Sequence, residues 1–256
     1  MIIKVDDTYN NQVMNYLKKE ADFNLLIIGE IERYGYNNYF FKIWADIDNY
    51  GNVKAILLKC FEYLIFYCDD DYNVEEFCSL INTLHYVQIS GKSKAIKEIG
   101  NKLNLKEDRV VNFCRLDNSD KLIEDNSKVK VKKIRLGKLK KVVKLYECIE
   151  EFENTTVQSI KNGLKSGRGY CIEINKKVIA MAKSTSENST HAMIVGVATH
   201  PLYRNKGYAT KCIIKICKEL IKESKIPCLF YDNEEAGKIY HKLGFENRGT
   251  WSIYCK

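Results

Sequence analysis

The sequence has little that would mark a membrane protein or a string of loosely linked modules. Its 256 residues include only two prolines, and neither a proline nor a Gly/Ser-rich linker occurs before residue 126. No apolar run approaches the roughly 20 residues that a membrane-spanning helix needs. The first thirty residues alternate charged and apolar positions too often for a signal peptide. We therefore expect a cytoplasmic protein with no membrane contact. Its 256 residues, 45% of them apolar, are enough for two domains that each bury a core of their own.

Cysteine is plentiful, but its spacing lacks the signature of a metal site. The ten cysteines are scattered singly, with no close CxxC pair and no histidine at a zinc-binding distance along the chain. Such cysteines are typical of small buried hydrophobic residues in a reducing cytoplasm. We therefore expect no metal in this protein.

Acidic residues are scarce in the second half of the chain. Residues 1–125 contain 15 Lys and Arg against 21 Asp and Glu, a net charge of −6, which leaves 26 against 12, or +14, for residues 126–256. The sign changes at the polar, turn-rich stretch 116–128, so we expect one domain over residues 1–125 and another over 126–256. A basic half can attract nucleic acid, an anionic cofactor or an acidic protein. Nucleic acid is the least favoured of these, because the sequence contains no helix-turn-helix and no aromatic-basic RNA motif.

The apolar periodicity of the second half predicts an alternating order of strands and helices. The expected elements are a strand at 129–134, helices at 137–152 and 156–167, three strands within 168–200, a helix at 209–224, a strand at 227–232, a helix at 234–243 and a strand at 251–255. This order indicates a mixed α/β fold with helices on both faces of one sheet.

The first half repeats part of this order. Residues 51–68 are similar to the strand pair within 176–198, and residues 87–103 are similar to 229–243, where a strand turns into a helix. An internal duplication is therefore predicted, with two tandem domains of one fold.

The stretch THPLYRNKGYATKCI, residues 199–213, has the composition of an anion-binding turn. The first turn of a helix presents unpaired N–H groups and the positive end of the helix dipole. Gly207 lets a ligand approach the backbone, the small Ala209 does not block it, and Arg204 and Lys206 add positive charge. Because the phosphate-binding patterns GxxxxGK[ST] and GxGxxG are both missing, the turn belongs to neither of those classes. Its charge suits a pyrophosphate.

The spacing R-x-x-G-x-A in this turn resembles the acetyl-CoA loop of the GNAT family of N-acetyltransferases, which reads Q/R-x-x-G-x-G/A. A second segment, LFYDNEEAGKIYHKLGF at 229–245, is similar to the family pattern N-x-x-A-x-x-x-Y-x-K-x-G-F. Its marked positions are filled by Asn233, Ala236, Tyr240, Lys242, Gly244 and Phe245. The resemblance covers roughly 128–256. It implies a GNAT acetyltransferase domain there, preceded by a degenerate GNAT-like domain.

The resemblance implies acetyl-CoA as the donor and a primary amine of an unidentified acceptor as the second substrate. Attack on the thioester builds negative charge on the carbonyl oxygen and on the departing sulfur. The backbone N–H of Val197 would stabilise the first and Tyr240 would protonate the second. The residues that the resemblance places on the cofactor are Val197, Thr199, Arg204, Asn205, Lys206, Gly207, Tyr208, Ala209, Thr210, Asn233 and Ala236.

Several interpretations remain open from the sequence. Tyr240 could be a core aromatic residue and Asn233 only a helix cap, in which case the protein would be a non-catalytic acyl-CoA sensor or interaction protein. Glu173, Tyr231 or a water chain could take the proton that the amine loses. Cys212 and Cys217 fall within the helical pattern without a Cys-His arrangement, which favours direct transfer.

The first half carries no counterpart of the basic turn. The position that corresponds to it holds Asp69, Asp70 and Asp71, and three carboxylates would repel a pyrophosphate. We therefore expect residues 1–125 to bind no CoA. They would instead shape the acceptor cleft, form a contact surface or act as an acidic cap, and the sequence favours no particular oligomeric state.

Overall fold

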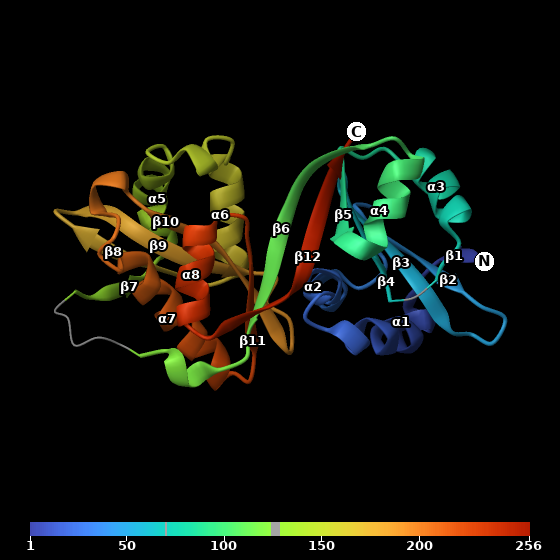
Figure 1. Ribbon diagram of the computed structural model, residues 1–256, viewed down its shortest axis with the longest axis horizontal. Helices are drawn as coiled ribbons and strands as arrows, with labels where there is room; N and C mark the ends of the chain where they lie inside the picture. The colour runs from blue at the N-terminus through green and yellow to red at the C-terminus, as the bar shows by residue number, and fades with distance from the viewer. Residues whose placement is uncertain (70, 124–128) are drawn as a thin grey trace. The chain divides into compact units, whose positions relative to one another are not determined.

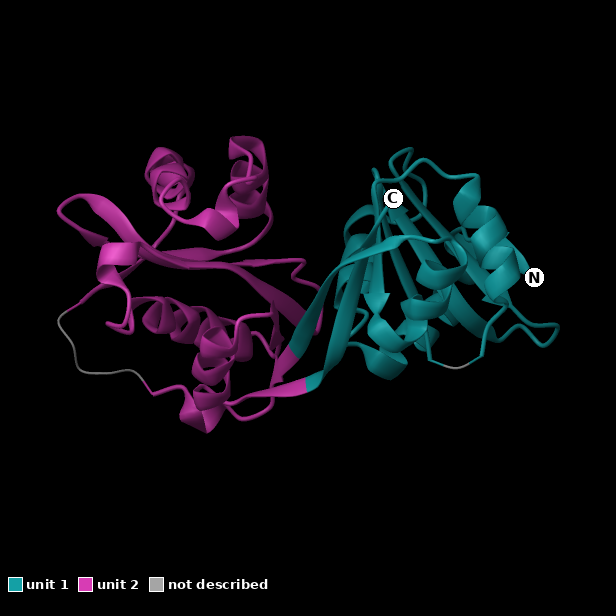
Figure 2. Ribbon diagram, turned by 45° about the horizontal axis from the view of Figure 1, so that its top comes forward, with its two compact units in different colours: residues 1–113, 248–256 teal, residues 114–247 magenta. Residues whose placement is uncertain are grey.

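The computed structural model describes residues 1–69, 71–123 and 129–256, which form two compact units (Figure 2). Unit 1 consists of residues 1–113 and 248–256, and unit 2 of residues 114–247. The boundary that the sequence predicts, between residues 125 and 126, lies outside the described residues. Within the described chain, no helix combines the length and the apolar character needed to cross a bilayer.

The same order of ten helices and strands occurs twice along the chain (Figure 1). The first set is β1 (Ile2–Lys4), α1 (Asn10–Leu17), α2 (Leu25–Tyr34), β2 (Phe41–Ile47), β3 (Val53–Cys60), β4 (Tyr63–Cys68), α3 (Val74–Asn82), β5 (Gln88–Lys92), α4 (Ser93–Lys102) and β6 (Lys106–Leu116). The second set is β7 (Val131–Lys133), α5 (Leu139–Tyr146), α6 (Val157–Ser166), β8 (Gly169–Ile174), β9 (Lys177–Thr185), β10 (His191–Thr199), α7 (Tyr208–Lys222), β11 (Ile226–Tyr231), α8 (Glu234–Lys242) and β12 (Phe245–Cys255). This order confirms the predicted mixed α/β fold class.

Unit 2 is a sheet covered by helices on both faces. Its strands follow the order β7-β8-β9-β10-β11. Of these neighbouring pairs, β10 and β11 run parallel and the other three run antiparallel. Helices α5 and α6 share one core with Met181 of β9, whereas α7 and α8 share another with Ile194 of β10. The two faces therefore have separate cores, as alternating side chains on a doubly covered sheet require.

Helix α7 shows how the sequence produces this packing. Its apolar residues recur at helical spacing, and the described side chains of Cys212, Ile213, Ile216, Cys217 and Leu220 are fully buried. Burying each such side chain stabilises the fold by roughly 1.5–3 kcal/mol. This burial fixes the start of α7 at the end of the basic turn.

The C-terminal strand completes the sheet of the N-terminal unit. Residues 251–255 of β12 pair antiparallel with β5, so the strand order of unit 1 is β1-β2-β3-β4-β5-β12. Helix α4 packs against the same segment, because a Cβ added to Gly100 would lie 2.5 Å from the Tyr254 ring. The sequence placed this strand in the second domain, whereas its pairing assigns it to unit 1.

One arginine ties three segments of unit 2 together. Arg168, just before β8, bonds to Glu187 of the β9–β10 turn at 2.6 Å and to Glu223 at the end of α7 at 2.7 Å. Burial would raise the pKa of Glu187, but hydrogen bonds from Arg168 and Ser184, together with the charges of Arg168 and Lys225, outweigh it and lower the pKa. Hydrogen bonds from Arg168 lower the pKa of Glu223 to about 2. These ion pairs connect the start of β8 to the β9–β10 turn and to the C-terminal end of α7.

Candidate functional site

Strand β10 separates from its neighbour β11 before it ends. The two strands pair only as far as Ile194 and Leu229, whereas β10 continues to Thr199. On its other edge, β10 contains a β-bulge where its register with β9 shifts. The β11-facing edge of residues 195–199 is therefore without a strand partner among the described residues. An extended ligand can add to such an edge through backbone hydrogen bonds.

Gly196 forms the bulge. Its φ of +59° lies in the left-handed region, where other residues are strained. A Cβ at this position would lie 2.3 Å from the hydroxyl oxygen of Tyr146, which approaches the Gly196 carbonyl at 3.5 Å. Gly196 is not among the site residues predicted from the sequence, although a glycine inside an apolar strand is a usual mark of a bulge.

The basic turn leads directly into helix α7, as the sequence predicts, and the structure adds that this helix start has no side-chain cap. Asn205 and Gly207 have φ of +61° and +69°, and Gly207 is the N-cap of α7 without a side-chain cap. The backbone N–H groups of Tyr208, Ala209 and Thr210 lie in the first turn of this 15-residue helix. A Cβ on Gly207 would meet nothing within 4 Å, so the helix start faces open space. This geometry is suited to binding an anion.

Two cations flank this helix start. Arg204 and Lys206 are exposed, and neither forms an ion pair with a described residue. The Nε of Arg204 lies 3.5 Å from the carbonyl oxygen of Thr199, and the Nζ of Lys206 lies 5.6 Å from the centre of the Tyr203 ring. Both charges are thus held near the end of β10 and remain available to an anionic ligand.

Tyr240 lies in the core cluster that borders the open edge of β10. Val197, Tyr208 and Ala236 pack against this cluster as partly buried residues, so the structure brings together residues from both sequence motifs. Tyr240 is 7% exposed, and its ring lies 5.9 Å from that of Tyr231. No described residue hydrogen-bonds its hydroxyl. Burial raises the pKa of Tyr240 to about 12, which keeps the hydroxyl protonated at neutral pH.

Asn233 acts as the N-cap of α8. Its side-chain oxygen accepts hydrogen bonds from the backbone N–H groups of Glu235 at 2.8 Å and Ala236 at 3.3 Å. The capping role that the sequence left open is therefore realised. The amide nitrogen of Asn233 is the part of the side chain that these bonds leave for a ligand.

The two candidate bases differ in their surroundings. Glu173 is held by Lys141, Lys138 and Lys132 at 2.8, 3.0 and 3.1 Å, and hydrogen bonds from the first two lower its pKa to about 2. A carboxylate that acidic is a poor proton acceptor at neutral pH, so the structure disfavours it as the base. The hydroxyl of Tyr231, by contrast, lies 3.2 Å from the Nε2 of His241.

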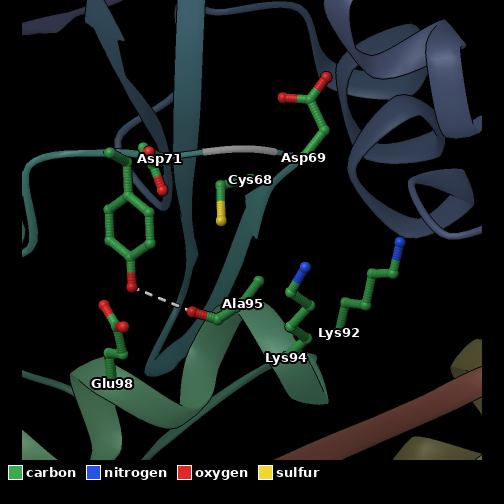
Figure 3. Close-up of a pocket in the computed structure, with 8 residues that line it drawn as sticks. Cys68, Asp69, Asp71, Lys92, Lys94, Ala95 and Glu98 are labelled. Carbon is green, nitrogen blue, oxygen red and sulfur yellow. Dashed lines mark hydrogen bonds between the residues drawn. The ribbon is translucent and has the colours of Figure 1, made fainter.

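The corresponding place in unit 1 is acidic. A cavity of about 210 Å³ lies beyond the ends of β4 and β5, and Asp69, Asp71 and Glu98 line it together with Lys92 and Lys94 (Figure 3). Burial would raise the pKa of Asp69, but hydrogen bonds from Tyr16 and Lys19 outweigh it and lower the pKa. Asp69 is thus ionised at neutral pH. No uncapped glycine start exists here, because Asn73 caps α3 by accepting from the Glu76 N–H at 3.1 Å.

Unit 2 therefore combines three features: the open edge of β10, the uncapped start of α7 and the buried Tyr240. The helices that carry the last two, α7 and α8, share one core on the same face of the sheet. This combination is suited to a ligand with an extended arm and an anionic end. The described residues contain no group of three or more His, Cys, Asp or Glu side chains that could hold a metal ion.

A family model described as GNAT acetyltransferase matches residues 42–254, and the chain belongs to this family. No curated protein matches the sequence. Three solved structures have a similar fold, and each match covers the whole of this chain and almost the whole of the other. A protein from Drosophila is 8% identical, with a TM-score of 0.72, and the match covers 100% of this chain and 98% of that one. A tandem GNAT protein from the clavulanic acid biosynthesis pathway is 10% identical, with a TM-score of 0.61 and the same coverage. An acetyltransferase of the GNAT family from Colwellia psychrerythraea is 13% identical, with a TM-score of 0.58 and full coverage of both chains.

These matches confirm the resemblance that the two sequence motifs indicate. They also confirm the fold, including its tandem arrangement. Membership of the family supports acyl transfer as the activity.

Proposed function

We propose that residues 126–256 carry an acetyltransferase domain that moves an acetyl group from acetyl-CoA directly to a primary amine. The observation that carries this proposal is the open edge of β10, which leads into the uncapped, basic start of α7 within a chain of the GNAT family. The edge suits the pantetheine arm, and the helix start suits the pyrophosphate. Residues 1–125 would form the degenerate domain that binds no CoA, consistent with the acidic cavity beyond β4.

Each end of the cofactor has proposed partners in unit 2. The backbone amides of residues 205–210, with Arg204 and Lys206 beside them, would hold the pyrophosphate. Val197 and Thr199 would pair with the pantetheine arm, and Asn233 would contact it through its amide nitrogen.

The chemistry proposed for unit 2 uses one backbone group and one side chain. The Val197 N–H would stabilise the oxyanion that forms when the amine attacks the thioester carbonyl. Tyr240 would then donate to the departing sulfur. Transfer would be direct, because Cys212 and Cys217 are fully buried in α7 and burial raises their pKa values, which keeps both thiols neutral. Tyr231 or a water chain would accept the amine proton.

A second candidate is an acyl-CoA-binding protein without catalysis. The observation in its favour is the burial of Tyr240, whose ring packs at 5.9 Å from Tyr231 and 6.1 Å from Phe245. In that case the cofactor would bind and the tyrosine would serve only in packing. Both candidates fit a reducing cytoplasm, because all ten cysteines are free.

Calorimetric titration with acetyl-CoA tests the shared part of both candidates. The intact chain should bind, and the double variant Arg204→Glu/Gly207→Glu should lose binding because it places two carboxylates at the proposed pyrophosphate position. Lys222→Glu is the matched control, since Lys222 is an exposed lysine at the end of α7 opposite to the turn. Binding that survives in the double variant, or a folded intact chain that does not bind, would refute the assignment.

A further inference from the structure

A cleft in unit 2 contains a single charged side chain. It is an open cleft against α6, β9 and β10 with a volume of about 580 Å³, which is within the range of small-molecule sites. Its described lining consists of hydroxyl and amide side chains of α6, together with Gly163, Thr185, Val195 and Lys183. No acidic residue is among these lining residues.

Lys183 is built into the floor of this cleft. It lies on β9 opposite Val195 of β10 and is only 9% exposed. A Cβ on Gly163 would lie 2.4 Å from its Nζ, and a Cβ on Gly196 would lie 3.0 Å from its Cε. The two glycines therefore leave a slot that the lysine stem fills, with its ammonium group at the cleft.

Lys183 has no counter-charge in the described part of the chain. Burial alone lowers its pKa, without an opposing contribution from a carboxylate. A buried ammonium group without an anion is costly, so an anionic group that entered the cleft would gain a strong, partly desolvated partner.

The rim of the cleft, like Lys183, favours a negatively charged ligand. Thr156 caps α6 by accepting from the Ser159 N–H at 3.1 Å, and both residues line the cleft. The cleft therefore includes the N-terminal turn of α6, where the helix dipole favours negative charge. Val195 also lines it, two residues before Val197, so the cleft adjoins the strand segment on which the thioester is proposed to lie.

We propose that this cleft receives the acyl acceptor and that Lys183 binds a carboxylate on that acceptor. The inference rests on the proposed acetyl transfer, whose acceptor class it names: a primary amine that also carries a carboxylate, as amino acids do. A polycationic acceptor such as a polyamine meets a lysine and no carboxylate among the described lining residues, and is disfavoured.

The first arm of the test measures binding without turnover. The protein is labelled with 13C at the lysine Cε, and the Lys183 signal is assigned as the one missing from Lys183→Met. With CoA present, the probes are glycine, β-alanine and 4-aminobutyrate, each paired with its neutral amide. At least one carboxylate should shift the Lys183 signal saturably and its amide should not, whereas Lys177→Met should behave as the intact protein. The absence of a saturable shift with every carboxylate, or an equal shift with the amides, would overturn the proposal.

The second arm measures acetyl transfer to the same pairs. A charge-assisted hydrogen bond makes kcat/KM higher for the carboxylate than for its amide by roughly 10- to 100-fold, and Lys183→Met should remove this preference. If Lys183→Met slows both members of a pair equally, Lys183 does not recognise the carboxylate. CoA binding, followed by calorimetry in the same samples, separates the two proposals. CoA binding without a response of Lys183 refutes the carboxylate site alone. A response of Lys183 without CoA binding refutes the proposed acetyl transfer and with it the acceptor role of the cleft, and leaves Lys183 as a carboxylate site only.

Discussion

Replacing Tyr240 with phenylalanine tests whether the protein is an enzyme or a cofactor-binding protein. The change removes one oxygen atom from a side chain that is 7% exposed and leaves the ring in place against Tyr231 and Phe245. Because no described residue hydrogen-bonds this hydroxyl, the variant leaves no buried partner unsatisfied. We expect its free energy of unfolding to change by less than about 1 kcal/mol.

The expected loss of rate follows from the pKa of the phenol. With a pKa near 12, complete transfer of its proton to a thiolate whose conjugate acid has a pKa of about 8.5 is uphill by about 5 kcal/mol. Tyr240 therefore stabilises the departing sulfur mainly as a hydrogen-bond donor while charge develops. A hydrogen bond to a charged group contributes about 1.5–3 kcal/mol, so Tyr240→Phe should lower kcat by roughly 10- to 150-fold.

The assay follows CoA release with an amine found by screening, alongside calorimetry of CoA binding and a thermal melt. The expected result is a lower kcat with unchanged CoA affinity and unchanged melting temperature. The same kcat in Tyr240→Phe as in the intact protein would refute the acid role. A lower kcat accompanied by a large drop in melting temperature would instead indicate that the hydroxyl has a structural role.

Three further predictions concern stability. The pKa of Glu173 is about 2 in the folded chain against an ordinary value of 4.5, so its contribution to the free energy of unfolding is present above pH 4.5 and is lost as the pH falls toward 2. Denaturant titrations between these pH values should show this acid-dependent loss of stability in the intact protein. In Glu173→Gln the loss should be smaller by about 1–2 kcal/mol, a figure that allows for the partly exposed lysine partners. Arg168→Met leaves the buried carboxylate of Glu187 without its main partner and should cost about 1–3 kcal/mol, measured by chemical unfolding; a loss below about 0.5 kcal/mol would contradict this. Gly100→Ala gains about 1 kcal/mol of helix propensity but pushes a methyl group into the Tyr254 ring, so a net loss of about 1–2 kcal/mol is expected, with CoA affinity unchanged; a more stable variant would show that β12 yields easily.

The sequence predicted those features of the fold that depend on local patterns. Helix α7 was identifiable because its buried residues recur at helical spacing, and the basic turn was identifiable because Arg204, Gly207 and Ala209 lie within six residues of one another. Each of these signals is carried by neighbouring residues. No long-range contact was needed to recognise them.

The features that escaped prediction depend on contacts between distant residues. The side chain of Lys183 looks like one more polar position in an apolar strand, because β9 is covered on both faces and its alternation does not distinguish them. Only the glycines of α6 and β10 create its slot. Similarly, the alternation of residues 251–255 predicts a strand but does not specify the sheet edge that it joins, which the structure places at β5.

Under the proposed function, one order of elements carries a binding site in the second half of the chain and none in the first. Strand β4 has six residues and a regular register with β3, whereas β10 has nine residues and a bulge at Gly196. The segment after β4 carries Asp69 and Asp71, and the segment after β10 carries Arg204 and Lys206. A pyrophosphate at the first place would face carboxylates, and at the second it would meet cations and unpaired N–H groups. Since the layers that bury the core recur in both halves, the proposed difference in function rests on one bulge, one glycine-containing turn and the sign of the charge beside it.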